Sequence, residues 1–219
     1  MAQSLKNPQV VPAPAAPAAP AAVRIHPTAI IEDGVQIGAG SSVWDNVHIR
    51  KGARIGEHCI VGEKSYIAYD VRIGNGVKIN SFVYIPTGVT IEDRVMISAG
   101  TIFVNDRYPR AFDARTGTLA SSDPNEETLE TRVREGATVG AGCTVLADLE
   151  IGAYALVGAG AVVVKSVPAH GLVVGNPARR IGWVCVCGKR LTVKGSKGSC
   201  PACRRAYAVT RNACKLQTR

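Results

Sequence analysis

The side chains best suited to bind a substrate lie in one segment, between Phe103 and Val133. Its first half carries five polar or aromatic side chains, which are Asn105, Asp106, Arg107, Tyr108 and Arg110. A loop of this length is uncommon in a compact domain and tends to be functional. We expect the first half to belong to a binding site. The alternative is a solvated excursion, which is the favoured interpretation for the stretch after Ala120.

A second group that could do chemistry lies near the C-terminus. Cys185 and Cys187 are followed, after twelve residues, by Cys200 and Cys203. The second pair resembles a knuckle of a zinc ribbon, whereas the first pair has one spacer residue where most knuckles have two. We predict a structural zinc ion on these four cysteines, with Cys214 as a substitute ligand. A module this small cannot hold together on its own apolar core, which favours the metal over a reduced, metal-free tail.

The elements that must position these residues follow a six-residue repeat. Ile or Val recurs at every sixth position from Ile25 to Ile97, and again from Val133 to Val163. A second track, four residues after each of these, is mostly small or β-branched. Period six fits neither an α-helix nor plain alternation. It predicts short strands, each followed by a turn, wound around a narrow core.

The repeat pattern resembles that of the hexapeptide-repeat proteins, in which three hexads form one coil of a triangular prism. The resemblance implies a left-handed parallel β-helix. Nineteen hexads give just over six coils, which stand about 30 Å tall at the usual strand spacing. We therefore expect an all-β chain with a β-helix over residues 25–182, a loop insertion at 104–132, and a zinc-ribbon-like module at 183–219. Residues 1–24, rich in Pro and Ala, are expected to be a disordered extension.

The resemblance becomes narrower over three segments. These read KINSFVYIPTGVTIEDRVMISAGTIFVNDRYPRAFD, REGATVGAGCTVLADLEIGAYALVGAGAVVVKSVP and VVGNPARRIGWVC. They are similar to CoA-dependent N-acetyltransferases that acylate nucleotide-linked amino sugars. Within that group they most resemble the enzymes that acetylate UDP-2-acetamido-3-amino-2,3-dideoxyglucuronate for bacterial surface polysaccharide. The dTDP-3-amino-deoxyhexose acetyltransferases share the NDRYP-like stretch and are the alternative; a non-enzymatic β-helix scaffold is another.

The family resemblance also implies where the active site lies. Its members are homotrimers, with acetyl-CoA stretched along the coils between neighbouring prisms and the nucleotide sugar across the gap. By resemblance, Asn80, Asn105 and Asp106 are the candidate catalytic residues that orient the sugar amine. A neutral amine attacks the thioester and the oxyanion needs a donor. We favour a route without a protein base, in which the departing CoA sulfur takes the proton. The candidate substrate-binding residues are Tyr108, Arg110 and His58.

The CoA contacts that the resemblance implies come from two kinds of residue. Small residues at corners permit close approach by pantetheine, and basic side chains neutralise the phosphates. The candidate CoA-binding residues are Ala99, Gly100, Ala141, Ala159, Gly160, Lys165, Arg179 and Arg180.

The four histidines do not identify a general base. His26 and His170 lie near prolines and are interpreted as surface residues. His48 and His58 fall at corner positions from which either could face a neighbouring molecule, although packing is the favoured alternative. A γ-class carbonic anhydrase shares the prism but needs three converging histidines. The absence of histidine between residues 59 and 169 argues against that class.

The positive charge is concentrated in the last third of the chain. The net charge is +9, and residues 151–219 hold 12 of the 26 basic residues and none of the 17 acidic ones. CoA phosphates account for Lys165, Arg179 and Arg180, which leaves nine basic residues in or beside the cysteine module. The module has few aromatic residues, Trp183 and Tyr207 among them, which argues against nucleic acid as a partner.

Compartment and membrane contact follow from two further features. No apolar run approaches the length of about 20 residues that a membrane helix needs, and the N-terminus lacks the apolar region of a secretory signal. We therefore expect a cytoplasmic protein without a membrane partner. In a reducing compartment, clustered cysteines are more typical of a metal site than of disulfide bonds.

Overall fold

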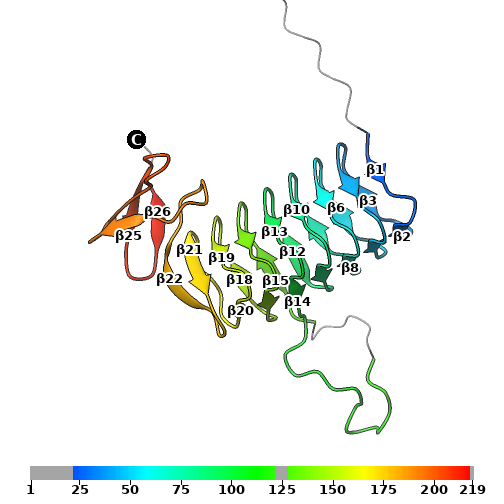
Figure 1. The fold of residues 1–219 in the computed structure, drawn as a ribbon. Coiled ribbons are helices and arrows are strands. Elements are labelled where there is room, and N and C mark those ends of the chain that lie inside the picture. The colour runs from blue at the N-terminus through cyan, green and yellow to red at the C-terminus, as the bar shows by residue number, and fades with distance from the viewer. Residues whose placement is uncertain (1–21, 122–127, 218–219) are drawn as a thin grey trace, which may run out of the picture.

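The computed structural model describes residues 22–121 and 128–217, and these form a stack of short parallel strands with a small sheet at one end (Figure 1). The predicted all-β parallel β-helix is therefore confirmed. The described residues include no helix that is long and apolar enough to cross a membrane. The predicted N-terminal extension lies almost wholly outside the described residues.

The prism has three faces, each a parallel sheet built from every third strand, except that face A ends in β21 and the antiparallel β22. Face A contains β1 (Arg24–Ile25), β4 (Ser42–Val43), β7 (Ile60–Val61), β10 (Lys78–Ile79), β13 (Met96–Ile97), β16 (Thr138–Val139), β19 (Leu156–Val157), β21 (Gly171–Val174) and β22 (Arg179–Trp183). Face B contains β2 (Ile30–Ile31), β5 (His48–Ile49), β8 (Tyr66–Ile67), β11 (Tyr84–Ile85), β14 (Ile102–Phe103), β17 (Thr144–Val145) and β20 (Val162–Val163). Face C contains β3 (Gln36–Ile37), β6 (Arg54–Ile55), β9 (Arg72–Ile73), β12 (Val89–Ile91), β15 (Thr131–Val133) and β18 (Glu150–Ile151).

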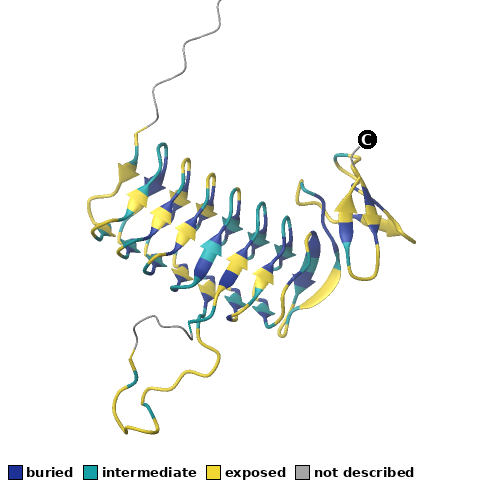
Figure 2. Cartoon of the chain, turned by 180° about the vertical axis from the view of Figure 1, so that it is seen from behind, coloured by how far each residue is buried: buried dark blue, intermediate teal, exposed yellow. Residues whose placement is uncertain are grey.

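The hexad explains why the strands are so short. In a typical two-residue strand the first side chain points outward and the second points inward, as in Arg72, which is exposed, and Ile73, which is 5% exposed. The inward Ile and Val residues of the three faces meet along the axis and form one continuous core. Figure 2 shows this buried interior alternating with exposed outer positions along the coils. Burial of these apolar side chains is the main stabilising contribution to such a fold.

Three corners join the faces, and we name each by the faces that it connects. The AB corner comprises residues 26–29, 44–47, 62–65, 80–83, 98–101, 140–143 and 158–161. The CA corner comprises residues 38–41, 56–59, 74–77, 92–95, 134–137, 152–155 and 168–170. The BC corner lies between faces B and C. Each corner holds a column of residues with positive φ, which at the CA corner are Gly40, His58, Gly76, Arg94, Gly136, Tyr154 and His170.

The long loop leaves the prism at the BC corner without disturbing the stack. Partners on neighbouring coils are 18 residues apart before it, as in Lys78 and Met96, and 42 apart across it, as in Ile97 and Val139. The repeat therefore resumes in register on the far side. The loop begins after β14 and ends at β15, whose first residue, Thr131, falls within the segment expected to be loop.

The chain ends in a small antiparallel sheet beyond the last coil. β22 turns back along β21 and leads to β23 (Thr192–Lys194), β24 (Lys197–Ser199), β25 (Ala206–Val209) and β26 (Cys214–Leu216), which pair in that order. We call residues 183–217 the ribbon. It has its own core of buried residues, which are Trp183, Cys185, Leu191, Cys200, Tyr207, Val209 and Cys214.

Candidate functional site

A ridge without side-chain bulk runs along the AB corner of the later coils. The earlier coils carry side chains in the positive-φ column, including Lys64 and Phe82, whereas the later coils carry Gly100, Gly142 and Gly160. The backbone is held coil to coil: Gly142 N–H donates to Ala99 C=O at 2.9 Å, and Gly160 N–H donates to Ala141 C=O at 2.8 Å. A Cβ on Gly142 or Gly160 would meet no atom within 4 Å. We call Ala99, Gly100, Ala141, Gly142, Ala159 and Gly160 the glycine ridge.

The ridge brings together five of the eight predicted CoA-binding residues and leaves backbone accessible along about two coil spacings. Small residues at a corner allow a ligand chain to approach the backbone closely. A long, thin ligand with amide groups could therefore lie along this corner.

The three predicted phosphate-binding cations are not gathered at the ridge. Arg179 follows Ala178, whose N–H donates to Val162 C=O at 2.8 Å just past the end of the ridge. Lys165 lies at the BC corner, on the other side of face B. Arg180 turns toward the ribbon, where its guanidinium lies 4.1 Å from the centroid of the Trp183 ring. Of the three, Arg179 has the place that best fits the prediction.

The base of the long loop is fixed to the coils on both sides. The Asn105 side-chain amide donates to Thr87 C=O at 3.1 Å, and the Asn105 carbonyl accepts the Leu129 N–H at 3.3 Å. Arg107 pairs with Asp148 on the following coil at 2.9 Å. Asp106, between these two anchors, is exposed. The loop base therefore presents Asp106 to solvent from a fixed position, while Asn105 is engaged in holding the loop.

Beyond its base the loop extends away from the prism (Figures 1 and 2). Tyr108 is 81% exposed, and within the described part of the chain the Arg110 guanidinium bonds only to the Pro109 carbonyl, at 2.9 Å. A bridge between Phe112 and Leu119 closes its outer part. Tyr108 and Arg110 are thus accessible to a ligand or to another copy of the chain.

Asn80 adjoins the glycine ridge. It lies at the AB corner after β10, and its backbone N–H donates to Ile97 C=O at 2.9 Å. Its carbonyl accepts the Ser65 hydroxyl at 3.0 Å. Within the described residues, the Asn80 side-chain amide makes no hydrogen bond. It is therefore available to a ligand lying along the ridge.

The remaining substrate candidate, His58, lies on a different edge. It belongs to the CA corner, where its ring occupies the space over Gly40; a Cβ on Gly40 would collide with His58 Nδ1. The structure thus groups Asn80 with the ridge at the AB corner and Asn105, Asp106, Tyr108 and Arg110 at the BC corner. It groups His58 with neither.

Face B separates these two groups, and its outer surface is largely apolar. The outward side chains include Ile30, Tyr84 and Ile102, which are about half exposed. The rings of Tyr66 and Tyr84 stack with centroids 5.4 Å apart. His48 is engaged within the chain, since its Nε2 lies 2.9 Å from Glu32 Oε1. The packing interpretation of His48 fits this contact.

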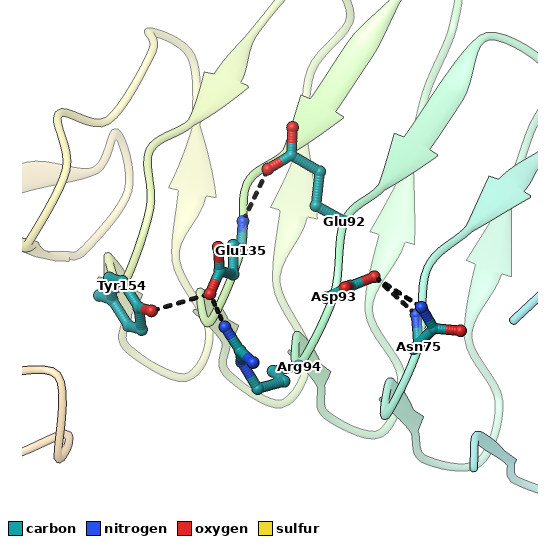
Figure 3. Close-up of polar contacts among 6 residues, drawn as sticks. All are labelled: Asn75, Glu92, Asp93, Arg94, Glu135 and Tyr154. Atoms are coloured by element: carbon teal, nitrogen blue, oxygen red, sulfur yellow. Dashed lines mark hydrogen bonds and ion pairs between the residues drawn. The ribbon is translucent and has the colours of Figure 1, made fainter. Parts of the chain in front are cut away.

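The CA corner carries a polar ladder that sequence reasoning did not identify (Figure 3). Asp93 Oδ1 accepts the Asn75 N–H at 2.7 Å, and Glu92 Oε2 accepts the Glu135 N–H at 3.0 Å. Glu135 also pairs with Arg94 and accepts the Tyr154 hydroxyl. Each side chain satisfies a group on the neighbouring coil, so these acidic residues hold coils together.

The interpretation of His170 as a surface residue is wrong. Its side chain is buried, with the residue 7% exposed, and its Nδ1 lies 3.0 Å from the Val184 carbonyl oxygen. Burial lowers the pKa of His170, opposed in part by the bond to the Val184 carbonyl. The signal in the sequence was its place at the end of the CA column, where the ribbon covers the last coil.

The ribbon places four thiols where they could bind one metal ion. The Sγ atoms of Cys185, Cys187, Cys200 and Cys203 all lie within 4.8 Å of one another. Four sulfurs tetrahedrally bound at about 2.3 Å would lie about 3.8 Å apart. The observed pairs are near this value, at 3.3 Å for Cys185–Cys203 and 3.5 Å for Cys187–Cys200. The donor set therefore fits zinc.

The surroundings of the thiols also fit a metal centre. The Tyr207 hydroxyl donates to Cys185 Sγ at 3.0 Å, and the Cys203 N–H donates to Cys200 Sγ at 3.5 Å. A backbone hydrogen bond from Arg205 is the largest cause that lowers the pKa of Cys203 to about 6. Cys214 is not part of the cluster; burial raises its pKa to about 11. The prediction of Cys214 as a substitute ligand has no support in this geometry.

Comparisons with known proteins agree with the repeat. Residues 35–69 and 70–105 match the family model described as bacterial transferase hexapeptide (six repeats), which covers about a third of the chain. A dTDP-3-amino-3,6-dideoxy-alpha-D-galactopyranose 3-N-acetyltransferase from Aneurinibacillus thermoaerophilus is 41% identical over 75 residues, which are 34% of this chain and 39% of that protein. Serine acetyltransferase from Salmonella typhimurium is 38% identical over 65 residues, which are 30% of this chain and 24% of that protein. The chain thus spans well under half the length of these relatives, both of which are acetyltransferases.

Solved structures with a similar arrangement include two acyltransferases. The acetyltransferase domain of PglB from Neisseria gonorrhoeae in complex with acetyl coenzyme A is 22% identical, with a TM-score of 0.47 over 74% of this chain and 58% of that one. AntD, an N-acyltransferase from Bacillus cereus in complex with dTDP and 3-hydroxybutyryl-CoA, is 20% identical, with a TM-score of 0.38 over 75% and 84%.

Proposed function

We propose that this hexapeptide-repeat chain is an acetyl-CoA-dependent N-acetyltransferase that acylates the amino group of a nucleotide-linked amino sugar. The observation that carries the proposal is the glycine ridge with Asn80 beside it. The ridge offers open space against backbone for pantetheine, and the Asn80 amide, which has no hydrogen-bond partner among the described residues, would contact the acceptor. The acetyltransferase names of the curated relatives support the reaction class.

The proposed site is completed by a neighbouring copy of the chain. In one prism the ridge and the loop base lie on two corners, on either side of the apolar face B. If three copies turn face B toward a common axis, the AB corner of each prism meets the BC corner of the next. Such a ring closes at three copies. The homotrimer would place Asp106, Tyr108 and Arg110 of one copy opposite the ridge of another.

The proposed chemistry needs positioning more than a base. The sugar's neutral amine attacks the thioester carbonyl, forming the C–N bond. The C–S bond then breaks, and the proton lost by the amine goes to the CoA sulfur. Asn80 and Asp106 would orient the amine by hydrogen bonds, and a ridge N–H would stabilise the oxyanion.

Within this class, we propose a UDP-linked 3-amino uronic acid as the acceptor. Among the described residues, the Arg110 guanidinium has only the Pro109 carbonyl as a partner, and a guanidinium on an open loop suits a carboxylate. A dTDP-3-amino-deoxyhexose lacks that carboxylate and is the alternative supported by the Aneurinibacillus relative. Acetyl-CoA is made in the cytoplasm, which is the compartment that we propose.

The test is release of free thiol from acetyl-CoA in the presence of a panel of UDP- and dTDP-linked amino sugars. We expect release that depends on an amino sugar and is greatest with the uronate. Asn80→Ala should lower kcat/KM about 100-fold, while Asn46→Ala, at the same corner on an early coil, should not. Thiol release that does not depend on an amino sugar would exclude the transferase activity. A preference for dTDP-linked sugars would show that the acceptor is a dTDP-3-amino-deoxyhexose instead of the UDP-linked uronate.

We also propose that the ribbon holds one structural zinc ion on Cys185, Cys187, Cys200 and Cys203. Its role would be to organise a module with a very small core. Metal analysis of the purified protein tests this; content well below one zinc ion per chain with the ribbon still folded would disprove it.

A further inference from the structure

One face of the ribbon sheet carries a straight row of lysines. The strand register pairs Lys194 with Lys197, Lys197 with Ala208, and Ala208 with Lys215. These four residues therefore form one line across all four strands. The neighbouring row, through Gly198 and Tyr207, points to the opposite, buried side, because side chains alternate along a strand. All three lysines are exposed.

The residues around the lysine row are small or polar. The next row on the same side is formed by Thr192, Ser199 and Ala206, with Gln217 beside Ala206. We call the two rows together the lysine face; its residues are Thr192, Lys194, Lys197, Ser199, Ala206, Ala208, Lys215 and Gln217. At a strand spacing of about 4.8 Å, the row from Lys194 to Lys215 spans about 14 Å. The lysine face contains no aromatic ring and no large apolar side chain.

In the part of the chain that the structure describes, no acidic side chain forms an ion pair with this face. Residues 151–219 contain no Asp or Glu. The ion pairs of the described residues all lie in the prism and its loop, the last of them at Glu150. The prism and its loop together, residues 25–182, hold 17 acidic and 15 basic residues. The positive charge of the ribbon is therefore available to an external anion.

The chemistry of the face favours one kind of anionic partner. Single-stranded nucleic acid binds through stacking on aromatic side chains as well as charge, and the ribbon's Trp183 and Tyr207 are both buried. Lysine is a compact charge on a flexible stem with no fixed geometry. Such charges suit a surface whose anions can rearrange beneath them, as lipid headgroups do.

We propose that the lysine face docks the protein on a bilayer surface that contains anionic phospholipid. The sheet stands beyond the last coil, at the end of the prism farthest from β1 (Figure 1). Contact there leaves the outer surface of face B uncovered. The expectation of no membrane partner rested on the absence of a membrane-spanning segment and of a secretory signal. Binding to the bilayer surface through the lysine face requires neither. The proposal is independent of the acetyltransferase function.

The test is co-sedimentation of the full-length protein with vesicles. One set contains phosphatidylcholine alone, and the other contains about a third phosphatidylglycerol. We expect binding to the anionic vesicles only, weakening as salt rises. Each basic residue at an anionic bilayer strengthens binding about fivefold. The triple variant Lys194→Gln, Lys197→Gln, Lys215→Gln should therefore bind about 100-fold more weakly, and each single variant about fivefold.

A matched control removes the same charge from the prism. Arg54→Gln, Arg72→Gln and Lys78→Gln together change three exposed, outward-facing residues of faces C and A. This control should retain most of the binding, and both triple variants should keep the metal content and Tm of the parent. Equal losses in the two triples would overturn the proposal, because binding would then follow net charge alone. Binding to phosphatidylcholine alone would also overturn it. The proposal would likewise be overturned if the protein did not bind anionic vesicles but bound an oligonucleotide through the three lysines.

Discussion

The ring of His170 stacks on the ring of Tyr154, with centroids 5.5 Å apart and planes inclined by 13°. The Tyr207 ring also contacts His170, in an edge-on arrangement with centroids 5.2 Å apart, and its hydroxyl donates to Cys185 Sγ. His170 therefore lies between the last turns of the CA corner and the ribbon core. The β-helix and the proposed metal centre are joined through three aromatic rings.

The first prediction concerns this junction. His170→Ala removes two ring contacts and the bond to the Val184 carbonyl, each of which contributes about 1 kcal/mol. We expect a loss of about 2–3 kcal/mol, which would lower the Tm by about 4–12 °C for a chain of this size. Circular dichroism during heating measures it. His26→Ala is the control, since His26 is exposed; equal effects of the two changes would contradict a role at the junction.

The second prediction is a dependence of this contact on pH. Burial lowers the pKa of His170 from its ordinary value of 6.5, so the unfolded chain takes up a proton at higher pH than the folded chain. The stabilisation by His170 is then complete above about pH 6.5 and is lost as pH falls toward the lower folded value. Tyr154 and Tyr207 face the ring, and burial raises the pKa of Tyr207 above its ordinary value. The Tm difference between the parent and His170→Asn should shrink from pH 7.5 to pH 5.5. A constant difference would contradict the shift. Loss of metal at acidic pH affects both proteins and cancels in the comparison.

The third prediction separates metal ligands from buried thiols. Cys203→Ser should reduce bound zinc from about one ion per chain to near zero and unfold the ribbon, since metal binding and folding are coupled in such modules. Cys214→Ser changes a thiol that is buried in the same core but lies outside the cluster. It should keep the metal. Inductively coupled plasma analysis gives both contents, and zinc retention by Cys203→Ser would contradict the assignment.

The sequence predicted the prism well because its period is local. An inward Ile or Val at every sixth position predicts where each strand and turn lies and to which face the strand belongs. The same register continues across the insertion, from Ile97 to Val139. The glycine ridge was equally predictable, since its residues occupy the same two adjacent positions of the hexad on three coils.

Residues that depend on contacts between elements were harder to predict. Lys165, Arg179 and Arg180 are near one another in sequence, but a corner and an antiparallel turn separate them in space. Lys165 lies at the BC corner, Arg179 lies near the end of the glycine ridge, and Arg180 contacts the ribbon. His170 was misinterpreted because its partners, Tyr154 and Tyr207, come from another coil and from the ribbon. The lysine face could not be predicted from the sequence. Lys194, Lys197 and Lys215 lie on one side of the sheet because of the register of the strands, and only the pairing of the strands defines that register.

The fourth prediction tests the glycine ridge with a matched pair of glycines. Gly142 and Gly34 both have positive φ, at 64° and 76°, and a Cβ on either meets no atom within 4 Å. Phe82 shows that the AB column accepts a phenylalanine with positive φ. Gly142→Phe should raise the KM for acetyl-CoA at least about tenfold by filling the ridge, with a backbone cost of about 1 kcal/mol. Gly34→Phe should have a similar cost in stability and an unchanged KM. Steady-state kinetics measure both, and equal KM values would exclude CoA from the ridge.

The fifth prediction concerns the anchor of the loop. The ion pair between Arg107 and Asp148 is exposed, so its removal should leave the Tm nearly unchanged. It joins the loop to the next coil, however, and so fixes the orientation of Asp106. Arg107→Ala should lower kcat/KM for the amino sugar about tenfold with little change in the KM for acetyl-CoA. Asp148→Ala should have the same effect, and the double variant should be no worse than either, since both changes break one contact. Arg115→Ala is the control, because the ion pair of Arg115 with Asp113 lies within the outer loop. Additive effects of Arg107→Ala and Asp148→Ala would show that each residue contacts the substrate separately and would contradict the anchor.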